Sequence, residues 1–335
     1  MALLLAGDIG GTKTLLAFYR TVGDQLELLA SRRYASSEWT DLAPMVCRFL
    51  EEAHPPGLGP PQAACFAVAG PVQSGRATLT NLPWQLDASR LRAETGIDRL
   101  ELVNDFAVLI YGLPSLSSDQ CAVVRAGEAL QDQPMLVLGA GTGLGVAYGI
   151  PTPAGVVSVA SEASHGEFAP RDAAEWRLKQ WLRAQLGLER VSIERVVSGP
   201  GLGLIARWLI SERQAEEGHP LLQLTQDLPS AVAMAAAKGD PLAREAMDRW
   251  LSAYGSVSGD LALAGLCRGG VWLAGGTAGK LLGELRGEAF LRGFQTKGRL
   301  SPVLEPLPIT AVTDAAVGQF SAACRARMIC SSPDR

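Results

Sequence analysis

The 335-residue sequence lacks the features that mark secreted, membrane and zinc-binding proteins. Its six cysteines are scattered, and no two form a C-x-x-C or C-x-C pair, so a structural zinc site is not expected. Single scattered cysteines are typical of reduced thiols in the cytosol. No uncharged apolar run approaches the roughly 20 residues of a membrane-spanning helix, and the first apolar run is too short for a signal peptide. We therefore expect a cytoplasmic protein.

Long basic stretches are also absent. The chain has 30 Lys and Arg against 34 Asp and Glu, for a net charge of −4. Nucleic acid and anionic membrane surfaces are therefore not expected as partners. The hydrophobic fraction of 47% and the charged fraction of 19% are ordinary for a globular protein long enough to form one large or two medium domains.

The first part of the chain has an α/β pattern. Leu3 to Ala6 is an apolar run that reaches a tight glycine turn, and Thr14 to Tyr19 continues as a second strand, which predicts a β-hairpin. The same reasoning predicts further strands over 26–34, 63–69 and 100–103, and helices over 42–53 and 86–94.

A second unit of strand, glycine turn and strand follows at 135–150. It repeats the layout of residues 3–19, which suggests two related halves. The remaining pattern predicts helices over 173–186, 202–213, 240–264 and 315–327, and a strand over 270–274. Within the longest helix, Gly255 and Gly259 are expected to allow close packing.

Three glycine turns, at 8–12, 139–145 and 274–277, each follow a short apolar strand. Glycine lets the backbone approach a ligand closely and direct several N–H groups at it, and threonine adds a hydroxyl donor. A single such turn is as often purely structural, but three of them favour a di- or triphosphate site.

Two familiar phosphate-binding motifs do not fit these turns. A P-loop requires glycine directly before lysine, and here Thr12 stands between Gly11 and Lys13. A dinucleotide-binding turn requires a third glycine where this chain has Leu144.

Several carboxylates lie where they could contact a hydroxylated substrate. Asp105 follows a short strand, and it could accept the proton of an attacking hydroxyl while Asn104 orients the same substrate. The structural alternative is that Asp105 caps a helix over 106–111. Glu162 and His165 lie three residues apart, and Glu194 precedes an expected turn at 198–201. These residues could bind sugar hydroxyls, although a lone glutamate is usually solvated and a lone histidine usually structural. A metal site at Glu162 and His165 is disfavoured because no third ligand lies nearby in sequence.

These motifs resemble the bacterial glucokinase family of the hexokinase/actin-like ATPase superfold, nearly end to end. The landmarks are Asp8-Ile-Gly-Gly-Thr-Lys13, Leu79-Thr-Asn-Leu-Pro-Trp84, Leu102-Val-Asn-Asp-Phe106, Gly139-Ala-Gly-Thr-Gly-Leu-Gly145, residues 162–170, Glu194-Arg-Val-Val-Ser-Gly-Pro-Gly201 and Ala274-Gly-Gly276. The sister group of repressors, open reading frames and kinases is less similar, since its zinc-binding cysteines and helix-turn-helix are absent here.

The resemblance implies specific roles. Asp105 is the general base for the 6-hydroxyl of the sugar, and Asn104, Glu162, His165 and Glu194 bind the other hydroxyls. Asp8 lies near Mg²⁺, through water. The residues implied in binding the nucleotide are Asp8, Gly10, Gly11, Thr12, Lys13, Gly141, Thr142, Gly143, Gly275 and Gly276.

The resemblance also implies a fold and an activity. The fold is two α/β domains of the hexokinase/actin-like (ribonuclease H-like) type flanking a cleft, with 1–113 and 313–335 in a small α/β domain and 114–312 in a large α+β domain. The last helix packs back on the first domain. The activity is ATP-dependent phosphorylation of D-glucose to glucose 6-phosphate in glycolysis, and a homodimer is implied.

Alternatives remain open at the level of the sequence. They are a kinase of another hexose or amino sugar, a sugar sensor without catalysis, a generic ATPase, and polyphosphate or ADP as the phosphoryl donor. The chain departs from the family at Ala163-Ser164, where Gly-Gly is frequent, and at Lys13, where Asn is common. Gly318 alone remains of a glycine-rich stretch over 314–320.

Overall fold

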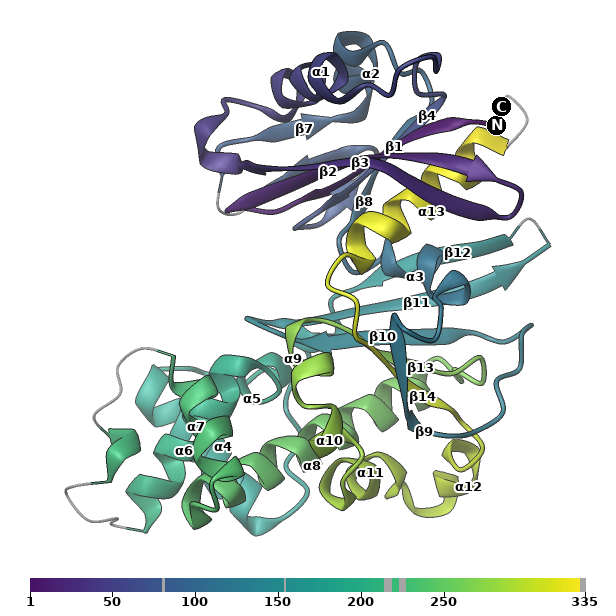
Figure 1. Ribbon diagram of the computed structural model, residues 1–335. Helices are drawn as coiled ribbons and strands as arrows, with labels where there is room; N and C mark the ends of the chain where they lie inside the picture. Colours follow the sequence, from purple (N-terminus) through teal and green to yellow (C-terminus); the bar gives the residue numbers. More distant parts are fainter. Residues whose placement is uncertain (80–81, 154, 214–218, 223–226, 332–335) are drawn as a thin grey trace. The chain divides into compact units, whose positions relative to one another are not determined.

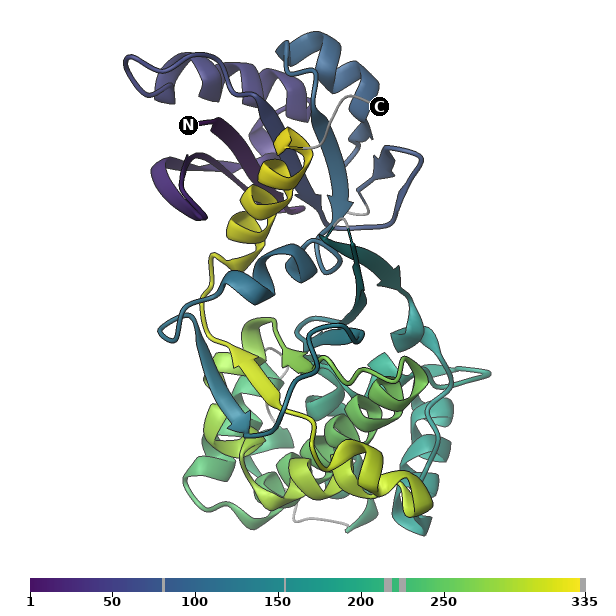
Figure 2. The same ribbon diagram turned by 90° about the vertical axis from the view of Figure 1, so that its right-hand side faces the viewer.

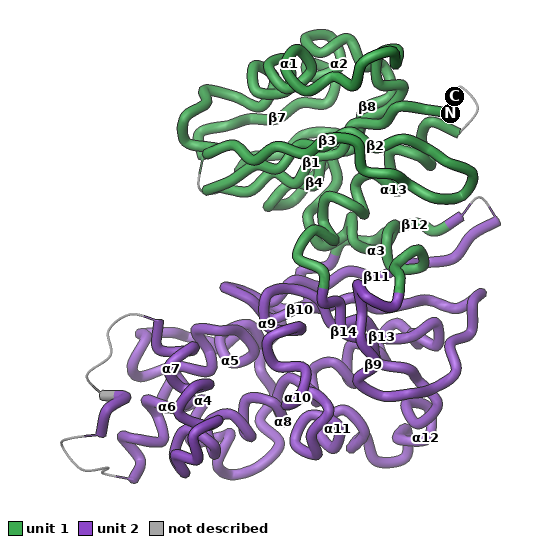
Figure 3. The backbone as a smooth tube through the Cα atoms, in the orientation of Figure 1, with its two compact units in different colours: residues 1–117, 156–160, 314–335 green, residues 118–155, 161–313 purple. Residues whose placement is uncertain are grey.

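The computed structural model describes residues 1–79, 82–153, 155–213, 219–222 and 227–331 (Figure 1). Two positions of the landmark at 79–84, residues 80 and 81, lie outside them. The chain divides into two compact units, unit 1 with residues 1–117, 156–160 and 314–335, and unit 2 with residues 118–155 and 161–313 (Figure 3). Among the described residues, no helix has the length and apolarity needed to span a membrane.

Unit 1 is built on a five-stranded sheet in the order β3-β2-β1-β4-β8. Its strands are β1 (Leu3–Ile9), β2 (Lys13–Val22), β3 (Gln25–Ala35), β4 (Ala63–Val68) and β8 (Leu100–Asn104). β1 and β2 form the predicted antiparallel hairpin, and β1, β4 and β8 are parallel. The carboxyl ends of these three strands therefore lie at one edge of the sheet, which is where open α/β sheets bind ligands.

Local capping sets the helices of unit 1. α1 (Leu42–Ala53) agrees with its prediction, and Asp41 accepts the N–H of Leu42. α2 (Ala88–Thr95) begins two residues after the predicted start, because Asp87 ends β7 (Gln85–Asp87) and caps the helix. β7 belongs to a small sheet with β5 (Val72–Gln73) and β6 (Arg76–Thr78), which was not predicted.

The C-terminal helix α13 (Val317–Ser331) packs on the sheet of unit 1. It lies beside this sheet in both views (Figures 1 and 2). Arg325 pairs with Glu101 of β8 at 2.8 Å, and Arg99 Nη1 donates to the carbonyls of Ile329 and Cys330. The predicted last helix and its packing on the N-terminal sheet are confirmed.

The second sheet repeats the strand order of the first and adds one strand. It has six strands in the order β12-β11-β10-β13-β14-β9, namely β9 (Cys121–Arg125), β10 (Met135–Ala140), β11 (Leu144–Thr152), β12 (Gly155–Ser161), β13 (Val271–Leu273) and β14 (Ile309–Val312). The run β12-β11-β10-β13-β14 corresponds to β3-β2-β1-β4-β8 of the first sheet. β10 and β11 form an antiparallel hairpin, and β10, β13 and β14 are parallel. The predicted relation between the two halves is therefore confirmed. β9, β14 and β12 (Gly155–Ser161) were not predicted.

The described part of unit 2 also contains a series of helices. They are α4 (Ala173–Leu186), α5 (Ile193–Val196), α6 (Gly199–Glu212), α7 (Leu228–Ala237), α8 (Pro241–Ala264), α9 (Gly276–Lys280), α10 (Leu282–Leu285), α11 (Glu288–Gln295) and α12 (Ser301–Leu304). α4 and α8 agree with their predictions. The turn expected at 198–201 was wrong: Ser198 accepts the N–H of Gly201 and caps α6, so these residues form the first turn of that helix.

The predicted close packing at the glycines of α8 is confirmed. A Cβ atom on Gly255 would lie 2.0 Å from the carbonyl oxygen of Phe290 in α11, and one on Gly259 would lie 2.4 Å from that of Phe294. The two helices thus approach through their backbones. Trp250 and Tyr254 of α8 are fully buried in the core that this packing forms.

Candidate active site

The first glycine turn joins β1 to β2 in unit 1. Gly10 N–H donates to the carbonyl of Lys13 at 3.0 Å, which closes the turn. Ser36 stabilises the turn through two hydrogen bonds. Its Oγ donates to the carbonyl of Gly10 at 2.8 Å, and its N–H donates to the carbonyl of Thr12 at 3.1 Å. Ser36 is fully buried, whereas Thr12 and Lys13 are exposed. The turn is therefore held from the protein side and open to a ligand on the other.

Asp8 lies near the carboxyl end of β1, just before this turn. Burial raises the pKa of its carboxyl group, and the charge of Lys13 partly opposes that rise. A Cβ atom on Gly318, near the start of α13, would lie 3.1 Å from Asp8 Oδ2. Glycine at 318 thus leaves room beside the carboxylate.

Asn104 is the last residue of β8 and Asp105 follows it, at the same edge of the sheet. The Asn104 side chain is fully engaged: Nδ2 donates to the carbonyl of Gly70 and to Asp105 Oδ1, both at 3.0 Å, and Oδ1 accepts the N–H groups of Phe106 and Ala107. Asn104, and not Asp105 alone, therefore caps this turn. The expected helix over 106–111 was wrong in its bounds, because the structure has α3 over Leu109–Gly112.

The Asp105 carboxylate is fixed through one oxygen. Oδ1 accepts hydrogen bonds from Asn104 Nδ2 and from Phe106 N–H, both at 3.0 Å. In the described part of the chain, Oδ2 accepts no hydrogen bond from another residue. Burial and then the charge of Asp8 raise the pKa of Asp105 to about 6, against the opposing effect of these hydrogen bonds. A half-buried carboxylate with one oriented oxygen and a pKa near neutrality suits a general base.

In unit 2 the other two glycine turns form one hydrogen-bonded group. The hydroxyl of Thr277 donates to the carbonyl of Ala140 at 2.6 Å, and Ala274 N–H donates to the carbonyl of Leu138 at 2.9 Å. Gly275 has a φ of +82°, a conformation that favours glycine, and a Cβ atom there would lie 3.4 Å from the same carbonyl of Ala140. The turns after β10 and β13 are therefore adjacent.

Glu194, in α5, reaches the first of these turns. Its Oε2 accepts the N–H of Leu144 at 2.9 Å. Glu162 and His165 are exposed, and His165 Nε2 lies 3.5 Å from Glu162 Oε2. Ile193 N–H donates to the carbonyl of Gly166 at 2.8 Å, which places the segment of Glu162 and His165 beside that of Glu194.

The structure thus collects the predicted site residues in two groups. Unit 1 holds Asn104, Asp105, Asp8 and the turn at 10–13, and unit 2 holds Glu162, His165, Glu194 and the turns at 141–143 and 275–276. The sequence interpretation missed Ser36 and the space at Gly318, and it assigned the Thr277 hydroxyl to a ligand, whereas in the structure this hydroxyl donates to the carbonyl of Ala140. Gly318 had left a signal in the sequence, as a glycine near the start of the last helix, whereas Ser36 had left none.

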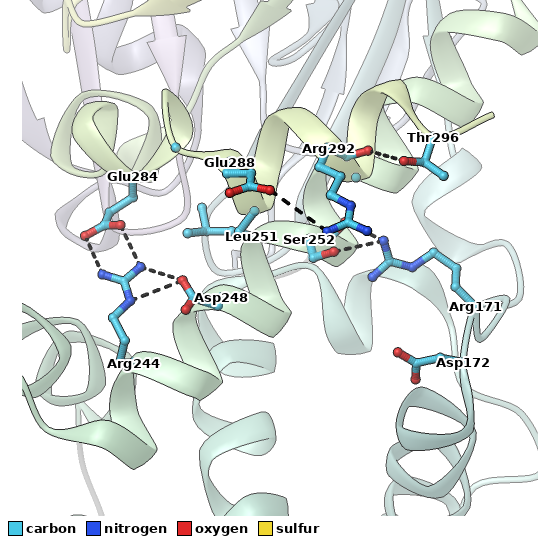
Figure 4. A pocket seen from close by; sticks show the side chains of 13 residues that line it. Arg171, Asp172, Arg244, Asp248, Leu251, Ser252, Glu284, Glu288, Arg292 and Thr296 are labelled. Carbon is cyan, nitrogen blue, oxygen red and sulfur yellow. Dashed lines mark hydrogen bonds and ion pairs between the residues drawn. The ribbon is translucent and has the colours of Figure 1, made fainter. Parts of the chain in front are cut away.

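A separate pocket of about 740 Å³ in unit 2 contains none of the predicted site residues (Figure 4). Its arginines are paired with acids. Arg244 binds Glu284 and Asp248 at 2.8 and 2.7 Å, Arg171 pairs with Glu175, and Arg292 lies 3.9 Å from Glu288. Because these guanidinium groups already have carboxylate partners, the pocket is a poor site for a phosphate, and we assign it a structural role.

Two sheets that share the order of five strands, each with a glycine turn inside its antiparallel hairpin, define a protein of the actin-like ATPase superfold. Comparison with known proteins gives the family: the family model named Glucokinase matches residues 5–329. The chain belongs to the glucokinase family.

Individual relatives agree along nearly the whole chain. A glucokinase of Synechocystis sp. is 42% identical, over 95% of this chain and 96% of the relative. A glucokinase of Nostoc punctiforme is 38% identical, over 98% and 100%. The crystal structure of a glucokinase from an Antarctic psychrotroph superposes with a TM-score of 0.85 at 28% identity, over 98% of this chain and 99% of that one.

Proposed function

We propose that this chain transfers the γ-phosphoryl group of ATP to the 6-hydroxyl of D-glucose. Membership of the glucokinase family supports this reaction. The observation in the structure that carries the proposal is Asp105, whose carboxylate is oriented through Oδ1, is open at Oδ2 and has a pKa of about 6.

In the proposed reaction, Asp105 Oδ2 accepts the proton of the 6-hydroxyl as the oxygen attacks the γ-phosphorus. The new O–P bond forms while the bond from the γ-phosphorus to the bridging oxygen of ADP breaks, and ADP keeps that electron pair. A positioned base contributes roughly 10²–10⁴-fold to such a rate. Asn104 holds Asp105 for this role through its Nδ2 donor.

Phosphates would be bound by backbone N–H groups of the glycine turns at 10–13 and 141–143, with Gly275 and Gly276 near the adenosine. Such groups stabilise charge on the transferring phosphoryl group without reorganising. We also propose two domains, one of 1–113 with 313–335 and one of 114–312. Closure of these domains would exclude water as a competing acceptor.

Mg²⁺ fits the residues present. Asp8 is a half-buried carboxylate whose charge raises the pKa of nearby Asp105, and a divalent cation would relieve this repulsion. Mg²⁺ in phosphoryl-transfer sites keeps several waters and uses one or two carboxylates together with substrate phosphates, so Asp8 alone, acting through water, suffices. The ion would supply positive charge to the β- and γ-phosphates.

The sugar would be recognised by Glu162, His165, Glu194 and Asn104. Asn104 is already saturated with protein hydrogen bonds, so a hydroxyl would have to replace one of them. The exposed side chains of Glu162 and His165 are free to adapt to a ligand. We further propose that the protein acts in the cytoplasm as a homodimer, with no nucleic acid or membrane partner.

A panel of sugars tests the proposal. Purified protein with Mg-ATP is given glucose, mannose, fructose, galactose, glucosamine and N-acetylglucosamine in turn, and ADP release is followed by a coupled assay. The proposal requires release that glucose stimulates most. Release without dependence on sugar would indicate a generic ATPase, binding without release would indicate a sensor, and a stronger response to another sugar would reassign the substrate.

A further inference from the structure

The carboxylate of Glu194 contacts a part of unit 2 that its proposed role in sugar binding does not require. Leu144, whose N–H donates to Oε2, directly follows the glycine turn at 141–143. A Cβ atom on Gly143 would lie 2.4 Å from this oxygen and 3.2 Å from Cδ of Glu194. The carboxylate therefore lies against the backbone of the turn, and glycine at 143 leaves the room that it occupies.

The segment that carries Glu194 is fastened to this turn at a second point. Gly199 N–H, in the first turn of α6, donates to the carbonyl of Gly141 at 2.8 Å. The capping residue before it, Ser198, is held by Trp250, whose Nε1 donates to the Ser198 carbonyl at 2.9 Å from the buried face of α8. Residues 194–199 thus form hydrogen bonds with both ends of the turn, and the hydrogen bond from Trp250 connects this segment to the core.

The contact leaves other N–H groups of the turn available. Gly141 N–H is used within the turn, where it donates to the carbonyl of Gly143. The N–H groups of Thr142 and Gly143 donate to no other group in the described residues. Glu194 therefore accepts the N–H of Leu144 and leaves the N–H groups of Thr142 and Gly143 available to a phosphate. The carboxylate thus stabilises the turn without blocking it.

We propose that Glu194 is a positioning residue for the nucleotide as well as a ligand of the sugar, an inference that rests on the proposed function. Oε2 fixes the phosphate-binding turn through Leu144 N–H. Oε1 accepts no hydrogen bond among the described residues, so it is open to a sugar hydroxyl. One carboxylate then joins the sugar subsite to the phosphate turn, and loss of it weakens nucleotide binding even when no sugar is present.

The test is nucleotide binding without sugar, measured by calorimetry with Mg²⁺ and a non-hydrolysable ATP analogue. Glu194→Ala removes the acceptor of the Leu144 hydrogen bond and is expected to weaken binding about tenfold, the effect of losing a hydrogen bond to a charged group. Glu194→Gln keeps a carbonyl oxygen for this N–H and is expected to bind the nucleotide nearly as the unchanged protein does. Glu162→Ala is the matched control, because Glu162 is a proposed sugar ligand with no contact to the turn.

A double-mutant cycle isolates the contact. Gly143→Ala puts a methyl group where the Glu194 carboxylate lies, so it is expected to weaken nucleotide binding in the unchanged background and to add no further loss in the Glu194→Ala background. Thermal unfolding verifies that each variant is folded.

Two outcomes overturn the inference. Equal nucleotide affinity in Glu194→Ala and the unchanged protein shows that the carboxylate acts on the sugar alone, and tighter binding in Glu194→Ala shows that it obstructs the phosphates. Strictly additive losses in the cycle also contradict it. Failure of the proposed function is a separate result, since it is seen in the unchanged protein as absence of sugar-dependent turnover.

Discussion

Replacing the proposed base should make the protein more stable while it abolishes activity. Asp105→Asn keeps an Oδ1 acceptor for both Asn104 Nδ2 and Phe106 N–H, so the local structure is preserved. It removes a negative charge that is half-buried and that lies near the negative charge of Asp8. The folded protein therefore holds Asp105 in an unfavourable ionised state, as is common for catalytic groups, and the neutral amide removes this destabilisation.

The size of the gain follows from the pKa of Asp105. A rise from 3.8 to about 6 means that the folded state disfavours the ionised form, with a ceiling of about 3 kcal/mol. Because Asp105 is partly exposed, solvent screening reduces this to about 1–2 kcal/mol. The gain is complete above about pH 6, where folded Asp105 is ionised, and it shrinks as the pH falls through 4, because below the unfolded pKa of 3.8 the carboxyl group is neutral in both the folded and the unfolded chain.

Thermal unfolding at pH 8, 6 and 4 measures the effect. We expect Asp105→Asn to raise Tm by a few degrees at pH 8 and by much less at pH 4. Asp98→Asn, at an exposed position just before β8, is the matched control and should not change Tm. A Tm for Asp105→Asn that is equal to or lower than that of the unchanged protein at pH 8 would refute the argument that Asp105 is held in an unfavourable ionised state.

Four further results are expected. The value of kcat/KM should fall about tenfold between pH 7 and pH 5, because the base must be ionised and its pKa is about 6; a flat profile over this range would contradict the assignment. Gly318→Ala should raise the Mg²⁺ concentration that gives half-maximal rate, since its Cβ would lie 3.1 Å from Asp8 Oδ2; an unchanged Mg²⁺ titration would show that Asp8 has room to move. Gly255→Ala should destabilise the fold by roughly 1–3 kcal/mol or more in thermal unfolding, because its Cβ meets a backbone carbonyl at 2.0 Å, whereas Gly283→Ala, which meets nothing within 4 Å, should not. Arg244→Ala should lower Tm by breaking ion pairs worth about 1 kcal/mol or less each and leave the glucose KM unchanged; a shifted KM would give the pocket of Figure 4 a functional role.

Local sequence signals predicted the parts of the fold that depend on short-range chemistry. The hairpin at 3–19, the helix α1 and the long helix α8 follow from apolar periodicity together with capping by Asp41 and Asp240. The glycine turns were visible because each is a local departure from a strand pattern. The two related halves were visible for the same reason, as a repeated strand, turn and strand.

The sequence pattern did not predict the contacts between residues that are far apart in the chain. β14 pairs with β13 and β9, but its four residues lack any neighbour in sequence that would identify them as a strand. Ser36 lies 26 residues from Gly10 and is a plain serine in the sequence. The hydrogen bond from Leu144 N–H to Glu194 spans 50 residues and uses a backbone group, so no pattern of side chains reports it.

The most direct test of the account is the formation of glucose 6-phosphate. Protein, Mg-ATP and D-glucose are mixed, and the product is followed through a coupled glucose-6-phosphate dehydrogenase, with Asp105→Asn measured beside the unchanged chain. The account predicts rapid product formation that falls by roughly 10²–10⁴-fold in Asp105→Asn. No product from the folded, nucleotide-binding protein would contradict the proposed reaction, and undiminished product from Asp105→Asn would contradict the role of Asp105.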